Sequence, residues 1–196
     1  MPLGAFKAAL MGTAGVSTAD VVLLSSQTAS SSSTISFTSG IDSTYGEYIF
    51  KFYNIHPSAD ASEFQFQVNA SDGSGYNETI TSTVFRAYHN EDDSATSLSY
   101  SASSDQAQGT SYQTLMLDLD NDADSAGAGE LHLFNPSSTT YVKHFYAETQ
   151  YSYDASLTYN NFVAGYINTT TAIDDVQFKM ASGNIDAGTI KMWGVK

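Results

Sequence analysis

The sequence predicts an all-β fold: a single antiparallel β-sandwich of jelly-roll-like type with a short N-terminal arm. Three observations predict it. Short segments alternate polar and apolar residues with a period of two, as half-buried strands do. Aromatic residues make up 13% of the 196 residues, and they favour strands. Polar turns separate the segments, with no sign of the crossover helices that parallel sheets require.

The clearest strand is 63–69, where Phe64, Phe66 and Val68 face one way and the Gln residues the other. Pro57 ends the strand before it, because its ring removes a ladder donor. Helical turns are conceivable only at 5–11 and 155–161. The strands expected, in chain order, are 33–38, 47–55, 63–69, 79–88, 96–101, 111–117, 130–135, 141–148, 159–167, 176–180 and 189–194.

The chain divides into an N-terminal docking arm with a Ser-rich linker, residues 1–32, and a β-sandwich domain, residues 33–196. The first fifteen residues lack a basic start and an uninterrupted apolar run, so they favour an arm over the alternative, a weak signal peptide. The Ser-rich stretch 25–33 is the expected linker. The apolar side chains expected to dock are Leu3, Phe6, Leu10 and Met11.

Composition excludes several classes of partner. The chain has 21 acidic and 7 basic residues, a formal net charge of −14, which repels nucleic-acid phosphates and anionic membranes. No run approaches the ~20 apolar residues that span a bilayer, so membrane insertion is not expected. Charged residues are only 14% of the chain, so the surface is mostly uncharged and polar, as is common in extracellular and virion proteins. Cysteine is absent, which excludes disulfides and thiol nucleophiles.

Catalytic motifs are missing. The chain has no G-x-S-x-G elbow, phosphate-binding loop, dinucleotide fingerprint or H-E-x-x-H pattern. The sequence therefore predicts that the protein is not an enzyme. Glycoside hydrolysis stays open as an alternative because Glu47, Glu63, Glu130 and Glu148 lie in or beside strands, although nothing in their spacing places two carboxylates at the ~5–10 Å that hydrolysis needs.

An acidic loop is the first candidate metal site. It carries Asp118, Asp120, Asp122 and Asp124 in a Gly/Ala-rich segment, and carboxylates are the oxygen ligands that Ca²⁺ prefers. The helix–loop–helix calcium pattern is not met, since its glycine and glutamate positions hold Ala123 and Gly129. A solvated acidic loop is the alternative. The sequence predicts no cofactor, with calcium left open at this loop.

Two histidines form a second candidate metal site. If the hairpin around 135–141 is centred on Ser138, His132 and His144 lie opposite each other, with Cβ atoms ~4.5–5.5 Å apart. Two imidazoles at that distance could share a divalent ion. A register slip would remove the pairing, and ordinary packed histidines are the alternative.

Tyrosines gather in the C-terminal half of the chain. A tyrosine offers a flat apolar face beside a hydrogen-bonding tip, which suits glycan recognition. A tyrosine-rich core or a subunit interface would produce the same pattern. The tyrosines of this candidate glycan site are Tyr141, Tyr146, Tyr151 and Tyr153, with Tyr159 nearby.

Four stretches resemble short β-rich virion structural proteins of marine tailed bacteriophages. They are the opening MPLGAFKAALMG, residues 46–55, residues 130–136 and the closing GTIKMWGVK. The resemblance runs over most of the chain and brings no catalytic residues with it.

The resemblance implies a structural protein on the virion surface, either a capsid decoration (cement) protein or a fibre or tail-attached module. Its partners would be other capsid or tail proteins. Such modules associate as symmetric homo-oligomers, with trimers favoured by analogy. A host-glycan-binding adhesin that uses the tyrosine-rich face is the alternative.

Overall fold

The computed structural model describes residues 20–153 and 156–196, and these form thirteen antiparallel strands without a helix. The prediction of an all-β antiparallel sandwich is confirmed. The strands are β1 (Val21–Thr28), β2 (Ile35–Phe37), β3 (Glu47–Pro57), β4 (Ser62–Ala70), β5 (Ile80–Asn90), β6 (Thr96–Tyr100), β7 (Ala107–Gly109), β8 (Gln113–Leu119), β9 (Gly127–Phe134), β10 (Lys143–Tyr153), β11 (Leu157–Ile167), β12 (Ile173–Met180) and β13 (Ile185–Val195).

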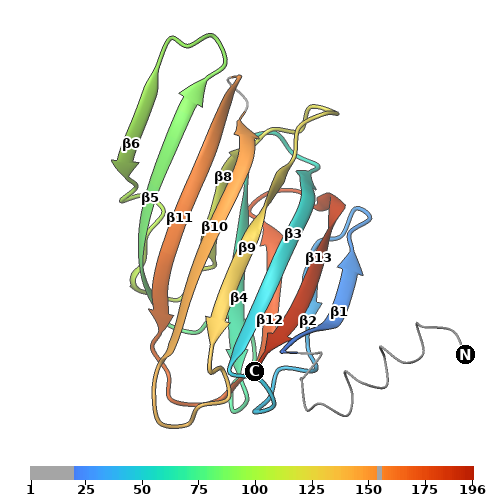
Figure 1. Cartoon of the computed structure of the whole chain (residues 1–196), viewed down its shortest axis with the longest axis vertical. Coiled ribbons are helices and arrows are strands. Elements are labelled where there is room, and N and C mark those ends of the chain that lie inside the picture. The colour runs from blue at the N-terminus through green and yellow to red at the C-terminus, as the bar shows by residue number, and fades with distance from the viewer. Residues whose placement is uncertain (1–19, 154–155) are drawn as a thin grey trace, which may run out of the picture.

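The strands form two layers (Figure 1). The large sheet has the order β1-β13-β3-β9-β10-β11-β5-β6, with the short β7 also on β5. The small sheet, β8-β4-β12-β2, lies behind it. From β1 to β5 the chain passes between the layers at every step, as chains do in jelly rolls. One pair, Tyr153 with Leu119, joins the two sheets between β10 and β8.

A cluster of phenylalanine rings fills the space between the sheets. Phe178 of β12 lies at its centre, with its ring centroid 5.3 Å from that of Phe52 on the large sheet. Its ring also stacks on Phe64 of the small sheet at 5.7 Å. Phe37, Phe50 and Phe66 complete its surroundings, and all six rings are buried. Aromatic contacts therefore hold the two layers together.

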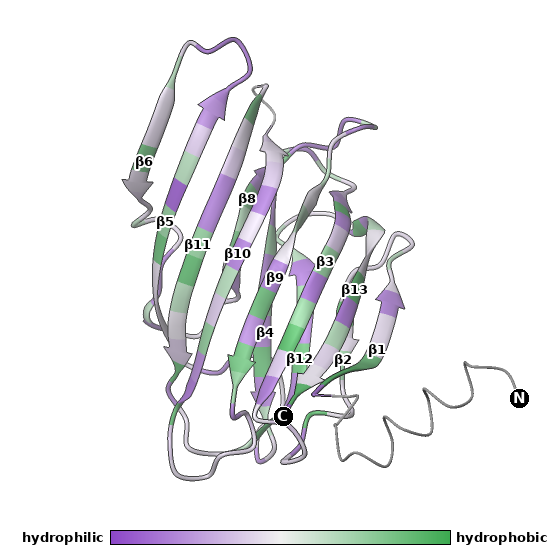
Figure 2. Ribbon diagram, in the orientation of Figure 1, coloured by the Kyte–Doolittle hydropathy of each residue, from purple (hydrophilic) through white to green (hydrophobic). Residues whose placement is uncertain are grey.

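Period-two alternation along the strands sets the two faces of each sheet. In β10, every second residue from Lys143 to Tyr151 is buried and the residues between are exposed. The hydropathy colouring alternates in the same way along the front strands (Figure 2). In β4, Gln67 breaks the expected pattern because it is fully buried. Its amide donates to the carbonyls of Glu78 and Ser111, so a loop covers this side of β4.

The predicted boundary between linker and sandwich is wrong. Residues 25–28, expected to be part of the linker, lie in β1, which pairs with β13 from Val21 to Thr28. Ser32 continues the attachment through a bridge to Ile185. The serines of this segment interrupt the polar–apolar alternation by which a strand is recognised in a sequence. Their backbone groups still form hydrogen bonds with the edge of β13. The sandwich thus begins before residue 33. The helical turn expected at 155–161 is also wrong from Leu157 onward, where β11 runs.

Phe178→Ala tests the inter-sheet cluster. It should lower the free energy of unfolding by about 3–5 kcal/mol because it leaves a cavity among buried rings. Chemical denaturation measures the change. Phe85→Ala is the matched control, since Phe85 is 43% exposed on the large sheet and should cost much less. Equal losses for the two variants would contradict the assignment of Phe178 to the centre of the core.

Tyr151→Phe tests a second feature of the core, its buried phenols. Burial raises the pKa of Tyr151, whose hydroxyl accepts a bond from the Leu117 amide at 3.0 Å. The unfolded phenol ionises near pH 10 and the folded one at higher pH, so stability falls as pH rises above about 10. The variant should lose about 1 kcal/mol at neutral pH and show a shallower alkaline decline. Tyr141→Phe, at an exposed position, should follow the native protein; identical alkaline slopes in all three proteins would refute the prediction.

Candidate binding face

The large sheet has one face that the small sheet does not cover, and we call it the outer face. Its central part comes from the outward positions of β3, β9, β10 and β11, brought into register by the antiparallel ladders. Its side chains are Glu47, Ile49, Lys51, Tyr53, Ala128, Glu130, His132, Phe134, His144, Tyr146, Glu148, Gln150, Asn160, Phe162, Ala164 and Tyr166.

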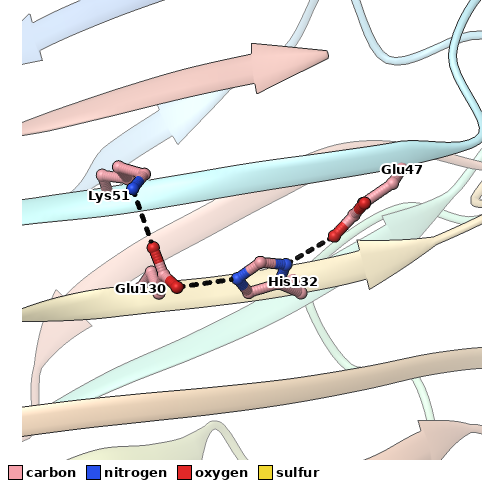
Figure 3. Close-up of polar contacts among 4 residues, drawn as sticks. All are labelled: Glu47, Lys51, Glu130 and His132. Carbon is pink, nitrogen blue, oxygen red and sulfur yellow. Dashed lines mark hydrogen bonds and ion pairs between the residues drawn. The ribbon is translucent and has the colours of Figure 1, made fainter. Parts of the chain in front are cut away.

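A row of charged groups crosses β3 and β9 on this face (Figure 3). His132 Nδ1 lies 2.5 Å from Glu47 Oε1 in a hydrogen bond. On its other side, His132 Nε2 lies 3.1 Å from Glu130 Oε1, at ion-pair distance but without hydrogen-bond geometry. The second Glu130 oxygen lies 3.0 Å from Lys51 Nζ. Two carboxylates therefore enclose one imidazole, and the ammonium balances the second carboxylate.

These contacts decide the charge of Glu130. Burial raises the pKa of Glu130, but the contacts with His132 and Lys51 outweigh it and leave the pKa below its usual value. The hydrogen bond to Glu130 in turn raises the pKa of Lys51. Both groups are therefore charged at neutral pH and stay in place as an ion pair.

Aromatic rings stack beside the charged row. The His132 ring stacks on Tyr146 of the neighbouring strand with centroids 4.4 Å apart, and Phe134 packs against the same tyrosine at 5.8 Å. Farther along the sheet, Phe85 stacks on Phe162 at 4.8 Å. Burial raises the pKa of Tyr146, and the nearby carboxylates raise it further. Its hydroxyl therefore stays protonated and can donate a hydrogen bond.

A depression of about 420 Å³ lies in the middle of the outer face. It forms where β9 carries Ala128 and Gly129 between larger side chains on both neighbouring strands. Its polar lining combines carboxylates, amides and an ammonium with one phenol ring. The side chains that provide this lining are Lys51, Tyr53, Glu130, Glu148, Gln150 and Asn160.

Glu130 and Glu148 are direct cross-strand partners at the edge of this depression. Like charges directly opposite each other destabilise a sheet. Lys51 balances one of them, and the Asn160 amide donates to Glu148 Oε1 at 3.2 Å. Solvation of a surface does not require two acids in facing positions, so this pair marks the depression as a candidate binding site.

The tyrosines predicted to form one glycan platform lie in different places. Tyr146 is on the outer face and Tyr141 is an exposed loop residue. Tyr151 is fully buried, and Tyr153 packs against the core next to Tyr159. The prediction of a shared platform is therefore wrong. Tyr146 and Tyr151 are an odd number of positions apart in one strand, which puts them on opposite faces.

The predicted histidine pair is also wrong. His132 lies opposite Tyr146, and His144 pairs with Tyr166 of β11. The hairpin is centred on Thr139, one residue later than expected, as the pairing of His132 with Tyr146 shows. Each shift of the hairpin centre by one residue moves the cross-strand partner by two residues. His132 and His144 therefore still lie on the same face of the sheet, but they are no longer directly opposite each other.

The acidic loop shows no gathered ligand set. Across residues 20–153 and 156–196, no three His, Cys, Asp or Glu side chains come together as a metal site. The predicted site at Asp118, Asp120, Asp122 and Asp124 therefore finds no support in the geometry. Asp120 instead holds the loop itself, accepting bonds of 2.9 Å from the Asp122 amide and the Ser125 hydroxyl.

The four glutamates of the hydrolase alternative divide between the sheets. Glu47, Glu130 and Glu148 lie on the outer face, whereas Glu63 is on the small sheet, bound to Thr114 at 2.7 Å. A general acid in glycoside hydrolysis needs a raised pKa. The pKa of Glu130 is lowered, so Glu130 does not suit that role.

The predicted docking side chains Leu3, Phe6, Leu10 and Met11 lie outside the described residues. In the part of the chain that the structure describes, no helix has the length and apolar character to cross a bilayer. Comparisons of the chain with protein-family models, with curated proteins and with solved structures found no match.

Lys51→Met tests the electrostatics of the charged row. Removing the ammonium should raise the pKa of Glu130, which carbon NMR of the labelled carboxyl groups measures across acidic pH. The pKa of Glu130 in the folded protein is below the ordinary glutamate pKa of about 4.3, so its stabilising contribution is present above that pH and lost as the pH falls through the folded pKa. Lys179→Met, on the small sheet over Tyr112, is the control. A Glu130 titration that neither variant alters would contradict the assignment.

Proposed function

We propose that the protein is a structural component of the exterior of a tailed bacteriophage particle. It serves there as a capsid decoration (cement) protein or as a fibre or tail-attached module. In this proposal residues 1–15 attach the chain to the particle, and the sandwich is displayed outward as a homo-oligomer, with a trimer as the favoured state.

The observation that carries the proposal is the character of the outer face. Single exposed apolar residues are normal on protein surfaces, so the distinguishing feature here is that nearly all of them share one face of one sheet. The cross-strand registers place almost all of the large exposed apolar side chains on the outer face. These are Val21, Leu23, Tyr53, Phe85, Leu98, Tyr100 and Tyr146.

Three further features support an exterior location. Three of the stretches that resemble phage virion proteins fall in β3, β9 and β13, which are neighbours in the large sheet. A net charge of −14 keeps a displayed domain soluble despite its apolar face. A body held by a packed aromatic core suits a protein that must stay folded without disulfides.

A host-glycan-binding adhesin is the second candidate, and a particular observation favours it. The outer face combines the exposed ring of Tyr146 with carboxylates and amides around the depression. Binding sites for small polar ligands are concave and have a few convergent polar groups. The two candidates are compatible, because an exterior virion protein can also recognise its host.

Deletion of residues 1–15 tests the attachment. The truncated protein should lose binding to particles that lack this protein, measured by co-sedimentation, because the apolar docking side chains are gone. It should still give the circular dichroism and melting of the native sandwich, since the described strands begin at Val21. Leu98→Ser, on the displayed face, is the control and should keep native particle binding. A truncated protein that still co-sediments would overturn the docking role.

A further inference from the structure

We propose that the depression on the outer face is a binding site for one ring of a neutral sugar. This inference rests on the proposed exterior role and names what the displayed face recognises. It assigns the site to Tyr53, Glu130, Glu148, Gln150 and Asn160, around a floor made by β9.

The shape of the depression is fixed by backbone packing. Gly129 has a φ of +153°, and a Cβ there would come within 2.3 Å of the Glu148 carbonyl oxygen. A larger residue at this position would force β9 and β10 apart. Ala128 beside it is exposed and small. The hollow is therefore part of the sheet, and its volume of about 420 Å³ suits a ligand of one or two sugar rings.

Tyr53 supplies a flat apolar wall. Tyr53 is 41% exposed, and Lys191 Nζ lies 5.1 Å from its ring centroid in a cation–π contact. An aromatic face pairs with the C–H face of a sugar ring, while polar groups around it bind the hydroxyls. Tyr53 and the polar lining thus match the two kinds of surface that a hexose presents.

The carboxylates of the polar lining have acceptor positions that no contact within the protein occupies. An ionised carboxylate offers about four acceptor positions, and the contacts with Lys51, His132 and Asn160 use only some of those on Glu130 and Glu148. Hydroxyls of a vicinal diol can donate to both carboxylates at once. A ligand that bridges this facing pair also relieves the cost of placing like charges opposite each other.

Charge selects a neutral sugar. The depression has two carboxylates and one ammonium among its lining residues, and the whole chain carries −14. Uronic acids, sialic acids and sulfated sugars would meet repulsion there. A divalent cation is disfavoured as the ligand because no group of three His, Cys, Asp or Glu side chains on the described part of the chain has an arrangement that could hold a metal ion.

Saturation-transfer NMR with methyl glycosides of glucose, galactose, mannose and N-acetylglucosamine tests the inference, with the glycoside of glucuronic acid as the anionic counterpart. At least one neutral glycoside should receive saturation, with a dissociation constant of about 1 mM, as expected for a single small ring. The glucuronide should receive none.

Ala128→Tyr is the decisive variant. It fills the depression from an outward position and should abolish the signal. Ala164→Tyr is the matched control, because it makes the same change on the same face outside the depression and should keep native affinity. Tyr53→Ala should weaken binding about tenfold, about 1.4 kcal/mol. Melting curves confirm that each variant is folded; should Ala128→Tyr not fold, Glu148→Gln replaces it, with the same loss of signal expected.

Two results would overturn the inference. One is that none of the four neutral glycosides receives saturation from the native protein. The other is that saturation transfer is unchanged in both Ala128→Tyr and Glu148→Gln. Neither result touches attachment to the particle, which depends on residues 1–15. A protein that co-sediments with particles yet binds no glycoside would keep its exterior role and lose the sugar site.

Discussion

Phe178 and the rings around it hold the two sheets of this protein together, and most other features follow from that contact. Phe50 and Phe52 meet Phe178 from the large sheet, and Phe64 and Phe66 lie beside it on the small sheet. Successive side chains on a strand point to opposite faces of the sheet. Because these rings point into the core, the residues next to them in the chain point outward. The residues of the outer face are therefore placed by the core behind them.

The depression shows how closely core and surface are linked. Gly127 and Gly129 lie at the start of β9, and a Cβ on Gly127 would come within 2.4 Å of Met116 Sδ in the core. Gly129 permits close approach of β9 to β10. Small residues that the packing requires thus leave a hollow on the exposed side. Glu130 and Glu148 follow in register beside it, and the ladders fix their distance from Lys51 and Asn160.

Much of the fold was predictable because local alternation carries strong information. The strand over 63–69 and the long strand from Glu47 were found from period-two patterns alone. β1 was missed because VVLLSSQT does not alternate and its pairing is made by backbone. The burial of Lys143 could not be predicted from the sequence either, because it depends on contacts that form only in the fold. Its ammonium donates to the carbonyls of Tyr141 and Thr169, both 3.1 Å away.

The site was harder to predict than the fold, since it depends on register between strands. Glu130 and Glu148 were noted as carboxylates, but their facing positions follow from a hairpin centre one residue away from the expected one. Tyr146 and Tyr151 could have been separated by sequence alone, because an odd spacing within one strand places two side chains on opposite faces. Lys51 and Tyr53 lie on β3 and Asn160 lies on β11, two strands distant in sequence that no local pattern connects.

We propose that the outer face of the large sheet is displayed for recognition while residues 1–15 attach the chain to the particle. Hydroxyl-radical footprinting of intact particles carrying the protein tests this directly. Tyr53, Tyr100 and Tyr146 are each 41–56% exposed in the protein alone. If the outer face is displayed, these three tyrosines are oxidised on the particle as fast as in the free protein. Strong protection of all three on the particle would show that the outer face is the attachment surface and would contradict its role in recognition.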